Sequence, residues 1–476
     1  MEKERLDMKK KLLSLFMAAC MVLPLAACGG QKADETKGAD TSAAQGETKA
    51  VETSGKTEAD SKAASEASAD GKEITLTVMH GRPDPTDTLH QYYLDVQKRY
   101  EEKYPNVKVE YEVYDNETYK KKLQIYGSTK SMPDVFFVWS NPSEFLPYVN
   151  AGLAAELNPG DFKDFNFTPG ALEGATVDGK LLGLPELIDY WYLYVNKKIF
   201  EDNNIKIPTT MSELKTAVTE LNKAGIAPIS MNGKDLWNQS VMFNDILFRY
   251  TGGDPNPIWD AASQKTKFAE TKEFTEAADM YKELVDMGLF QNSWTSDDEA
   301  TSKNLFVQGK AAMWYTGTWN NAIATSEDTP QELRDNVAII PFPSVDGKDT
   351  SDCLMGREGV SMMVAENSEY KPEAVNYLKE FFDPDFYPKA CWENGIGIPM
   401  QKFDQFVKDT DADLLKEAAK SISGAKAVAS HPYAFRLNAV FEQECKDLTM
   451  AFLLGQKTTD EFWKATDEAA AANQVK

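Results

Sequence analysis

The sequence predicts an α/β protein with more than one domain, and three observations lead to that class. The first is a strand-helix-strand-helix-strand pattern between Ile74 and Trp139, which is typical of a parallel sheet with helices on its faces. The second is a polar step from Glu186 to Asp189, which follows Pro185 and separates two apolar segments, as expected where a chain leaves one domain for another. The third is the length of 476 residues, enough for two or three domains.

The expected first domain begins with five elements. The strands are predicted from their content of β-branched and apolar residues, and the helices from the helical periodicity of their apolar residues. They are the strands 74–79, 107–113 and 135–139 and the helices 88–104 and 116–126. In parallel sheets, ligands bind beyond the carboxyl ends of the strands. We therefore expect the loops 80–87 and 139–142 at a binding site.

The segment after the polar step is rich in aromatic residues, which favours a strand over a helix. Alternation along the strand 190–195 puts Tyr190, Tyr192 and Tyr194 on one face. Trp191, Leu193 and Val195 then lie on the other face. Because both faces are large and partly apolar, we expect this strand to be covered on both sides.

The remaining chain alternates strands and helices without a repeat of fixed period. The expected strands are 226–231, 311–315, 337–342 and 360–364, and the expected helices are 212–224 with Ser212 as N-cap, 241–250, 271–287, 369–382, 387–394, 410–423, 435–454 and 459–472.

The N-terminus has the pattern of a secretory signal. Lys9 to Lys11 precede an apolar run, residues 12–25, which is too short for an ordinary membrane span. The run ends in Leu25-Ala26-Ala27-Cys28, which resembles the lipobox of bacterial lipoprotein precursors. The resemblance implies a signal peptide 1–27, a diacylglycerol on Cys28, and anchoring on the outer face of the cytoplasmic membrane. The alternative is an uncleaved signal anchor with an incidental cysteine, and Met8 could replace Met1 as the start.

Residues 28–72 form a low-complexity tether without aromatic residues, which cannot bury enough apolar surface to fold. The formal net charge of −24 argues against nucleic acid as a partner, because phosphate binding needs a basic surface. Cys353, Cys391 and Cys445 are too scattered for a disulfide framework, although one bridge remains possible.

Signals for catalysis, metals and cofactors are absent from the sequence. It has no phosphate loop, dinucleotide fingerprint or His-Glu-x-x-His motif, and its three His residues are isolated. Asp409-x-Asp411-x-Asp413 begins like a calcium loop, but Leu414 stands where such a loop needs glycine. We therefore expect no enzyme activity, no metal and no cofactor.

Several short motifs, each weak alone, occur in a specific order. They are Gly183-Leu-Pro185, Asn196-Lys197 with Phe200, Pro208-Thr-Thr-Met-Ser-Glu213-Leu214, Phe306-Val-Gln-Gly-Lys-Ala-Ala-Met313 with Gly317-Thr-Trp319, Gly395-Ile-Gly-Ile-Pro399, and Leu454-Gly455 with Thr459-Asp-Glu461. Together they resemble the bacterial extracellular solute-binding proteins of ATP-binding-cassette (ABC) importers, in the carbohydrate-associated, maltose-binding-protein-like group. The resemblance covers about residues 73–470, with Val195 and Met211 standing where the family often has Tyr and Trp.

The resemblance implies a two-lobed, type II-like periplasmic-binding-protein fold, in which each lobe is a mixed, mostly parallel sheet flanked by helices. Three crossovers are then expected near 185–189, 343–356 and 399–403. Lobe I would comprise 73–187 and 355–400, and lobe II 188–354 and 401–476. The chain would act as a monomer that captures a carbohydrate between its lobes and delivers it to an ABC permease, without breaking a bond.

Sugar recognition needs aromatic platforms for the C–H faces of the rings and planar polar groups for the hydroxyls. The candidate platforms are Trp319, which matches the family's Gly-x-Trp residue, and the loop residues Trp139 and Trp237, whereas Trp191 and Trp392 are expected in the core. The candidate polar contacts and their neighbours are Glu186, Asp189 and Tyr190 at the first crossover, Arg357 and Glu358 near a family Gly-rich segment, His80, Arg82 and Asp87 in the first loop, and Tyr433 and Arg436 near the family's late aromatic contact. For each of these residues, a purely structural role is the alternative.

Two other functions stay open from the residues alone. A secreted glycoside hydrolase would need two carboxylates across a cleft, and Glu186 with Asp189 could supply them. A binder of a non-sugar solute, such as a glycerophosphodiester or a peptide, would be favoured if Arg82, Arg357 and Arg436 converged.

Overall fold

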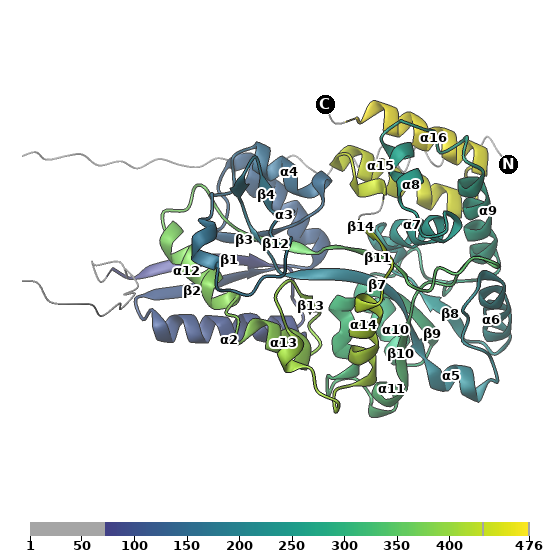
Figure 1. The fold of residues 1–476 in the computed structure, drawn as a ribbon, viewed down its shortest axis with the longest axis horizontal. Helices are drawn as coiled ribbons and strands as arrows, with labels where there is room; N and C mark the ends of the chain where they lie inside the picture. Colours follow the sequence, from purple (N-terminus) through teal and green to yellow (C-terminus); the bar gives the residue numbers. More distant parts are fainter. Residues whose placement is uncertain (1–71, 431–432, 475–476) are drawn as a thin grey trace, which may run out of the picture. The chain divides into compact units, whose positions relative to one another are not determined.

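Residues 72–430 and 433–474 are described by the structure, a computed structural model of the chain (Figure 1). These residues belong to one compact unit. The predicted signal peptide, Cys28 and residues 28–71 of the predicted tether lie outside the described residues. Across the two described ranges, no helix combines the length and apolar character that crossing a lipid bilayer requires.

The first sheet has five strands in the order β2-β1-β3-β12-β6, and Figure 1 labels β1, β2, β3 and β12 among them. They are β1 (Ile74–His80), β2 (Val107–Val113), β3 (Val135–Trp139), β6 (Leu184–Pro185) and β12 (Val360–Val364). β1 pairs in parallel with β2 and β3, which confirms the parallel arrangement predicted from the alternating pattern, and β12 runs antiparallel to β3. The helices α2 (Thr88–Lys103), α3 (Asn116–Thr129), α4 (Pro142–Asn150), α12 (Lys371–Phe381) and α13 (Tyr387–Glu393) bury residues in or against the core of this sheet.

The second sheet is built around β7 (Leu187–Asn196), the longest strand. The order is β14-β11-β7-β9-β8, and β10 and β13 also pair with β7. These strands are β8 (Ala227–Ser230), β9 (Ala311–Gly317), β10 (Val337–Ile340), β11 (Cys353–Glu358), β13 (Ile398–Pro399) and β14 (Ala427–Ser430), while β4 (Thr176–Val177) and β5 (Lys180–Leu181) form a separate hairpin.

The two faces of β7 enter different hydrophobic clusters. Trp191, Leu193 and Val195 belong to a cluster with α6, α7 and α9. Tyr190, Tyr192 and Tyr194 belong to another, with Trp314 and α14. The structure confirms the predicted strand, covered on both faces with this alternation.

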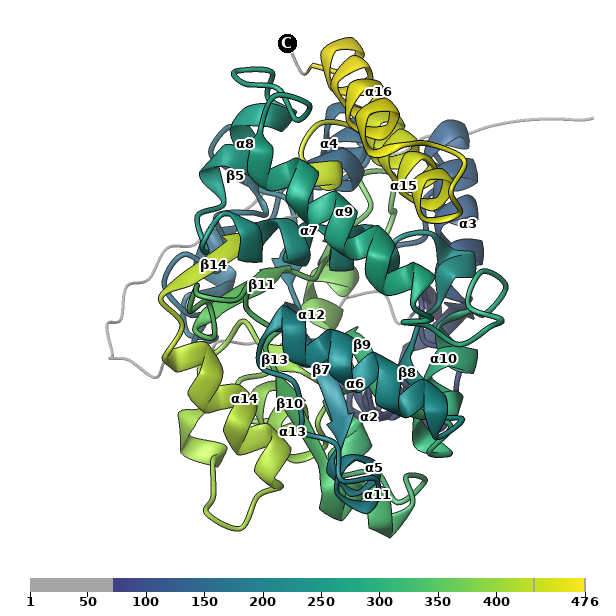
Figure 2. The ribbon, with the colours of Figure 1, turned by 90° about the vertical axis from the view of Figure 1, so that its right-hand side faces the viewer.

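The helices around the second sheet include α7, which is buried at every position. α15 and α16 pack against each other, and both contact α9 (Figures 1 and 2). The helices are α5 (Lys197–Asp202), α6 (Met211–Lys223), α7 (Asn238–Tyr250), α8 (Asn256–Ala262), α9 (Lys272–Asp286), α10 (Glu299–Val307), α11 (Gln331–Asn336), α14 (Asp413–Ser423), α15 (Ala439–Leu453) and α16 (Thr459–Ala472). The N-cap of α6 is Thr210 rather than Ser212, because Thr210 Oγ1 accepts from Glu213 N–H whereas Ser212 Oγ donates to Asp346.

The chain passes between the two sheets at Glu186, between β6 and β7, again at Gly359, between β11 and β12, and a third time between β12 and β13, which pairs with β7. The second position lies beyond the expected crossover 343–356. The reason is that residues 353–358 form a strand, β11, paired with β14 and β7 in the second sheet. The lobe boundaries themselves stay a prediction.

Candidate functional site

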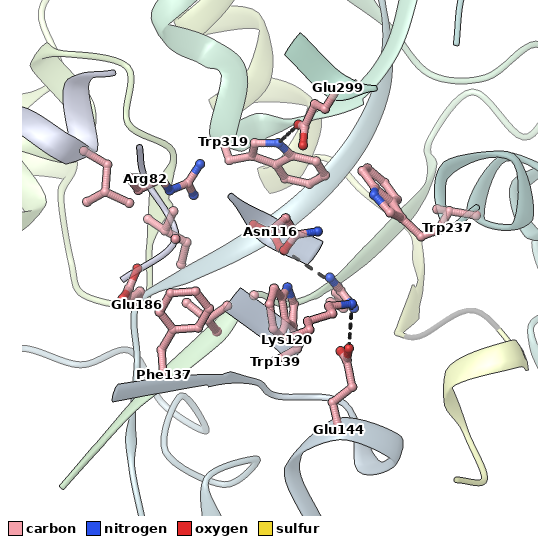
Figure 3. Close-up of a pocket in the computed structure, with 18 of the residues that line it drawn as sticks. Arg82, Asn116, Lys120, Phe137, Trp139, Glu144, Glu186, Trp237, Glu299 and Trp319 are labelled. Atoms are coloured by element: carbon pink, nitrogen blue, oxygen red, sulfur yellow. Dashed lines mark hydrogen bonds and ion pairs between the residues drawn. The ribbon is translucent and has the colours of Figure 1, made fainter. Parts of the chain in front are cut away.

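A cavity of about 130 Å³ lies where the two sheets meet (Figure 3). A single water needs only about 10–15 Å³ by such a measure, so the cavity can hold a larger solute. It is lined by Gly81, Arg82, Leu89, Tyr93, Asn116, Lys120, Phe137, Trp139, Glu144, Glu186, Leu187, Asp189, Trp191, Trp237, Val241, Glu299, Trp319, Arg357, Gly359, Val360 and Lys446.

Three tryptophans in or against the hydrophobic core that covers one face of the second sheet form one aromatic wall of the cavity. Trp319 follows β9 and lies edge-on to Trp191 of β7, with 5.3 Å between ring centres. Trp237, at the N-cap of α7, lies 6.1 Å from Trp319. Trp319 Nε1–H donates to Glu299 Oε1 at 3.0 Å, which fixes the ring in its plane (Figure 3).

The Gly-x-Trp motif has a steric explanation in this wall. The ring of Trp319 folds back over Gly317, and a Cβ on Gly317 would lie 1.8 Å from Trp319 Cζ3. Only glycine leaves room for this approach. Residue 317 therefore sets where the Trp319 ring lies.

The first sheet supplies a second set of aromatic residues. Trp139 ends β3 and Phe137 lies two residues before it, so alternation points both side chains to one face. Tyr119 stacks on Phe137 with 4.2 Å between ring centres. Lys120 Nζ lies 4.4 Å from the centre of the Trp139 ring, a cation–π contact. Aromatic side chains thus reach the cavity from both sheets.

The polar step at the first crossover carries two buried carboxylates into the cavity. Glu186 accepts a hydrogen bond from Tyr93 Oη at 3.2 Å, and Arg357 Nε lies 4.0 Å from Asp189 Oδ2. Burial raises the pKa of Glu186 to about 7 and that of Asp189 to about 6, against the opposing effects of Arg82 and Arg357. Desolvation therefore dominates at both positions.

Arg82 lines the cavity, and two other predicted site residues, His80 and Asp87, contact it. Asp87 caps α2 by accepting from Leu89 N–H and His90 N–H, and its Oδ2 lies 3.9 Å from Arg82 Nη1. His80 Nδ1 accepts from Arg82 N–H at 3.3 Å, and its ring stacks on Tyr93. Burial lowers the pKa of His80 to about 3, which keeps the imidazole neutral. His80 and Asp87 do not line the cavity themselves.

Four further predicted site residues are placed away from the cavity. Tyr190 faces the opposite side of β7 from Asp189. Glu358 is adjacent to Arg357 on β11, so its side chain points to the other face of the strand, where it lies beside Gly174. Tyr433 is buried against Phe268, in the hydrophobic cluster that also contains Trp191 of β7. The Arg436 guanidinium lies 4.4 Å from the centre of the Trp259 ring. Arg436 therefore does not converge with Arg82 and Arg357.

Five polar lining residues and Trp191 were not predicted. Lys120, Glu144, Lys446, Asn116 and Glu299 come from helices, where nothing in the local sequence distinguishes them from solvated side chains. Trp191 was expected in the core alone; it is buried and also lines the cavity. Alternation along β7 contains the missing signal, because Asp189 and Trp191 share a face while Tyr190 lies on the other.

Cationic side chains and carboxyl groups line the cavity in equal numbers. Four cationic side chains, Arg82, Lys120, Arg357 and Lys446, accompany four carboxylates, Glu144, Glu186, Asp189 and Glu299. Burial opposes ionisation of Glu144, but Lys120, whose Nζ lies 2.7 Å from Glu144 Oε1, together with Lys446 and Arg357 holds the pKa of Glu144 below its usual range. A cavity of this kind offers many hydrogen-bonding groups without a dominant charge.

The pKa of Glu186 predicts a pH dependence of stability. The native chain keeps a proton on Glu186 that an unfolded chain releases above about pH 4.5, so this contribution is full below about pH 4.5 and is lost as pH rises through about 7. Glu186→Gln should remove roughly 2–3 kcal/mol of this dependence, measured by urea unfolding between these pH values.

Glu358→Gln is the matched control, because burial raises the pKa of Glu358 to about 7 outside the cavity. Both variants should flatten the pH profile, but only Glu186→Gln should alter ligand affinity. An unchanged pH profile in Glu186→Gln would contradict the assigned burial.

Comparisons with known proteins are consistent with this geometry. A family model described as a bacterial extracellular solute-binding protein matches residues 83–385. A binding protein of Brucella abortus is 27% identical over 72% of this chain and 81% of its own. A diacetylchitobiose-binding protein of Streptomyces coelicolor is 25% identical over 82% of each chain.

A solved structure titled chitin oligosaccharide binding protein superposes with a TM-score of 0.74, at 21% identity. The match covers 84% of this chain and 99% of that chain. At this identity the likeness shows the fold, which confirms the predicted two-lobed α/β architecture.

Proposed function

The chain belongs to the bacterial extracellular solute-binding protein family, and from that premise we propose that it captures a neutral carbohydrate between its two sheets. It delivers the sugar to the permease of an ABC importer and breaks no bond. The chain works as a monomer from the outer face of the cytoplasmic membrane, held by a lipid on Cys28.

One observation supports the proposal: aromatic side chains from both sheets line a cavity together with equal numbers of cationic and carboxyl side chains. A pyranose ring presents apolar C–H faces, which suit Trp319 and Trp139, and equatorial hydroxyls, which suit the carboxylates and guanidinium groups. Trp191 Nε1 is buried and has no hydrogen-bond partner among the described residues. A ligand hydroxyl would satisfy this donor, which is costly to leave unpaired.

The same charges favour a neutral sugar over an anionic solute. Arg82 and Arg357 each lie near a carboxylate, and Arg436 lies elsewhere. A glycerophosphodiester would meet Glu186 and Asp189 as well as the arginines. The chitin-oligosaccharide and diacetylchitobiose binders among the similar proteins support a saccharide.

A thermal-shift screen followed by calorimetry tests the proposal. The panel contains neutral mono- and oligosaccharides, glycerophosphodiesters and short peptides, and each sugar is recovered and analysed for cleavage. We expect micromolar binding of a neutral saccharide without product. Binding of only the anionic or peptide solutes, or product from any glycoside, would overturn the proposal.

The lipid anchor has its own test. We expect the intact mass of chain extracted from membranes to correspond to a mature protein that begins at diacylglyceryl-Cys28. Cys28→Ala should release the chain into the medium or leave it unprocessed. A membrane-extracted chain with an unmodified Cys28 would contradict the anchor.

A further inference from the structure

Helices α4 and α15 belong to different cores and meet beside the cavity. Phe145 of α4 is buried in the core of the first sheet, and Phe441 of α15 in that of the second. Between them, Ser143 Oγ lies 2.5 Å from Glu442 Oε2. Ser143 is 1% exposed and Glu442 4%, so water does not compete for this contact.

The contact continues into a polar network on each side. On α15, Lys446 Nζ donates to Glu442 Oε1 at 2.5 Å, one helical turn away. Around α4, the N-cap Asn141 donates from Nδ2 to Glu144 Oε2 at 2.7 Å, and its Oδ1 lies 2.5 Å from Ser143 Oγ. The hydroxyl has one proton and donates to one of these oxygens at a time, and a carboxylate is the stronger acceptor.

Both ends of this network reach the cavity. Lys446 lines it from α15, and Glu144 lines it from α4 together with its partner Lys120 (Figure 3). Ser143 and Glu442 do not line the cavity. They instead connect the side chains that do, across the junction of the two cores.

We propose that Ser143 and Glu442 are positioning residues that join the two lobes next to the ligand and slow its release. This inference rests on the proposed function. All atoms of the bridge belong to the chain, and moving α4 away from α15 separates them. The bridge therefore stabilises only the closed arrangement, and a contact that favours one of two states shifts the equilibrium toward that state.

Such a contact acts on release more than on capture. A ligand enters before the bridge forms, whereas it leaves only after the bridge breaks. The hydrogen bond to a buried carboxylate should thus appear in the dissociation rate. It also keeps Glu144 and Lys446 facing the captured solute.

The first test is kinetic and uses the full chain with the saccharide that binds best in the screen. We expect Ser143→Ala to raise the dissociation rate about 5- to 30-fold, with little change in the association rate. Ser143→Thr keeps the hydroxyl and should restore slow release. Ser421→Ala is the matched control, because Ser421 accepts from Tyr192 Oη within the second lobe, away from the cavity.

The second test needs no ligand. Spin labels on Ile125→Cys in α3 and Leu454→Cys after α15 report the distance between the lobes, since both side chains are exposed and the cysteines of the described residues are buried. Ser143→Ala should shift this distance distribution toward longer values, and Ser143→Thr should restore it. The melting temperatures of both variants give a check on folding.

Each outcome is decisive. If wild type and Ser143→Ala release the sugar at equal rates, or have the same distance distribution, the bridge has no positioning role. If no saccharide binds, the proposed function fails, while the distance measurement still decides whether the bridge holds the lobes together.

Discussion

Trp319→Ala should weaken saccharide binding by roughly 10- to 100-fold, the largest loss expected from a single cavity residue. Truncation removes a large aromatic platform, and burying such a side chain contributes about 1.5–3 kcal/mol, where 1.4 kcal/mol corresponds to tenfold. It also leaves Glu299 without its indole donor at 3.0 Å. Titration calorimetry at constant pH measures the change.

Two substitutions separate the platform from its orientation. Trp319→Phe keeps an aromatic ring but loses the hydrogen bond to Glu299, so its affinity should lie between those of the wild type and Trp319→Ala. Gly317→Ala leaves the indole intact but displaces it, because the added Cβ would lie 1.8 Å from Trp319 Cζ3. It should weaken binding nearly as much as Trp319→Ala.

Trp259→Ala is the matched control for the loss of a tryptophan. Trp259, which belongs to α8, is also partly exposed. It packs under the guanidinium of Arg436 and does not line the cavity. Its removal should leave the affinity unchanged. If both variants lost the same affinity, the loss would reflect damage to folding rather than a missing contact. If Trp319→Ala bound the saccharide as tightly as the wild type, Trp319 would not be a ligand contact.

The sequence was sufficient for those parts of the fold that local pattern determines. The strands β1, β2 and β3 have β-branched or continuous apolar sequences, and β7 has an aromatic alternation that identifies both of its faces. β11 was missed because Gly356, Arg357 and Glu358 interrupt its apolar pattern. Its pairing with β7 and β14 depends on residues distant in sequence, which no local window contains.

The same division holds for the cavity. Arg82 and Trp319 follow strands and Trp139 ends one, and ligand contacts in a sheet of this kind lie at the carboxyl ends of the strands. Lys120 and Lys446 come from helices, so only the packing of α3 and α15 reveals them. Tyr190 and Glu358 were predicted by proximity to Asp189 and Arg357, but alternation points adjacent strand residues to opposite sides.

Asp245→Ala should lower the free energy of unfolding by about 3–5 kcal/mol, the largest stability loss expected here. Asp245 Oδ1 accepts from Arg249 Nη2 at 2.8 Å, and the two side chains are 0% and 1% exposed. Removing the carboxylate leaves a guanidinium buried without its counter-charge. Tyr315 Oη loses an acceptor as well.

Arg249 also connects α7 to the start of β11. Its Nη1 donates to the carbonyl oxygens of Thr350 at 2.6 Å and Cys353 at 2.7 Å. β11 carries Arg357 into the cavity. The buried pair thus fixes a strand that the site depends on, although neither charge lines the cavity.

Two controls make the Asp245 prediction specific. Asp260→Ala breaks a pair of nearly the same length, 2.9 Å to Lys265, on the surface, and should cost less than about 1 kcal/mol. Asp245→Leu with Arg249→Met replaces both charges by apolar groups and should lose less than Asp245→Ala alone, because no charge remains buried and unpaired. Urea unfolding followed by tryptophan fluorescence measures all three. Equal losses in Asp245→Ala and Asp260→Ala would mean that water reaches Arg249 and that this pair does not hold β11 in place.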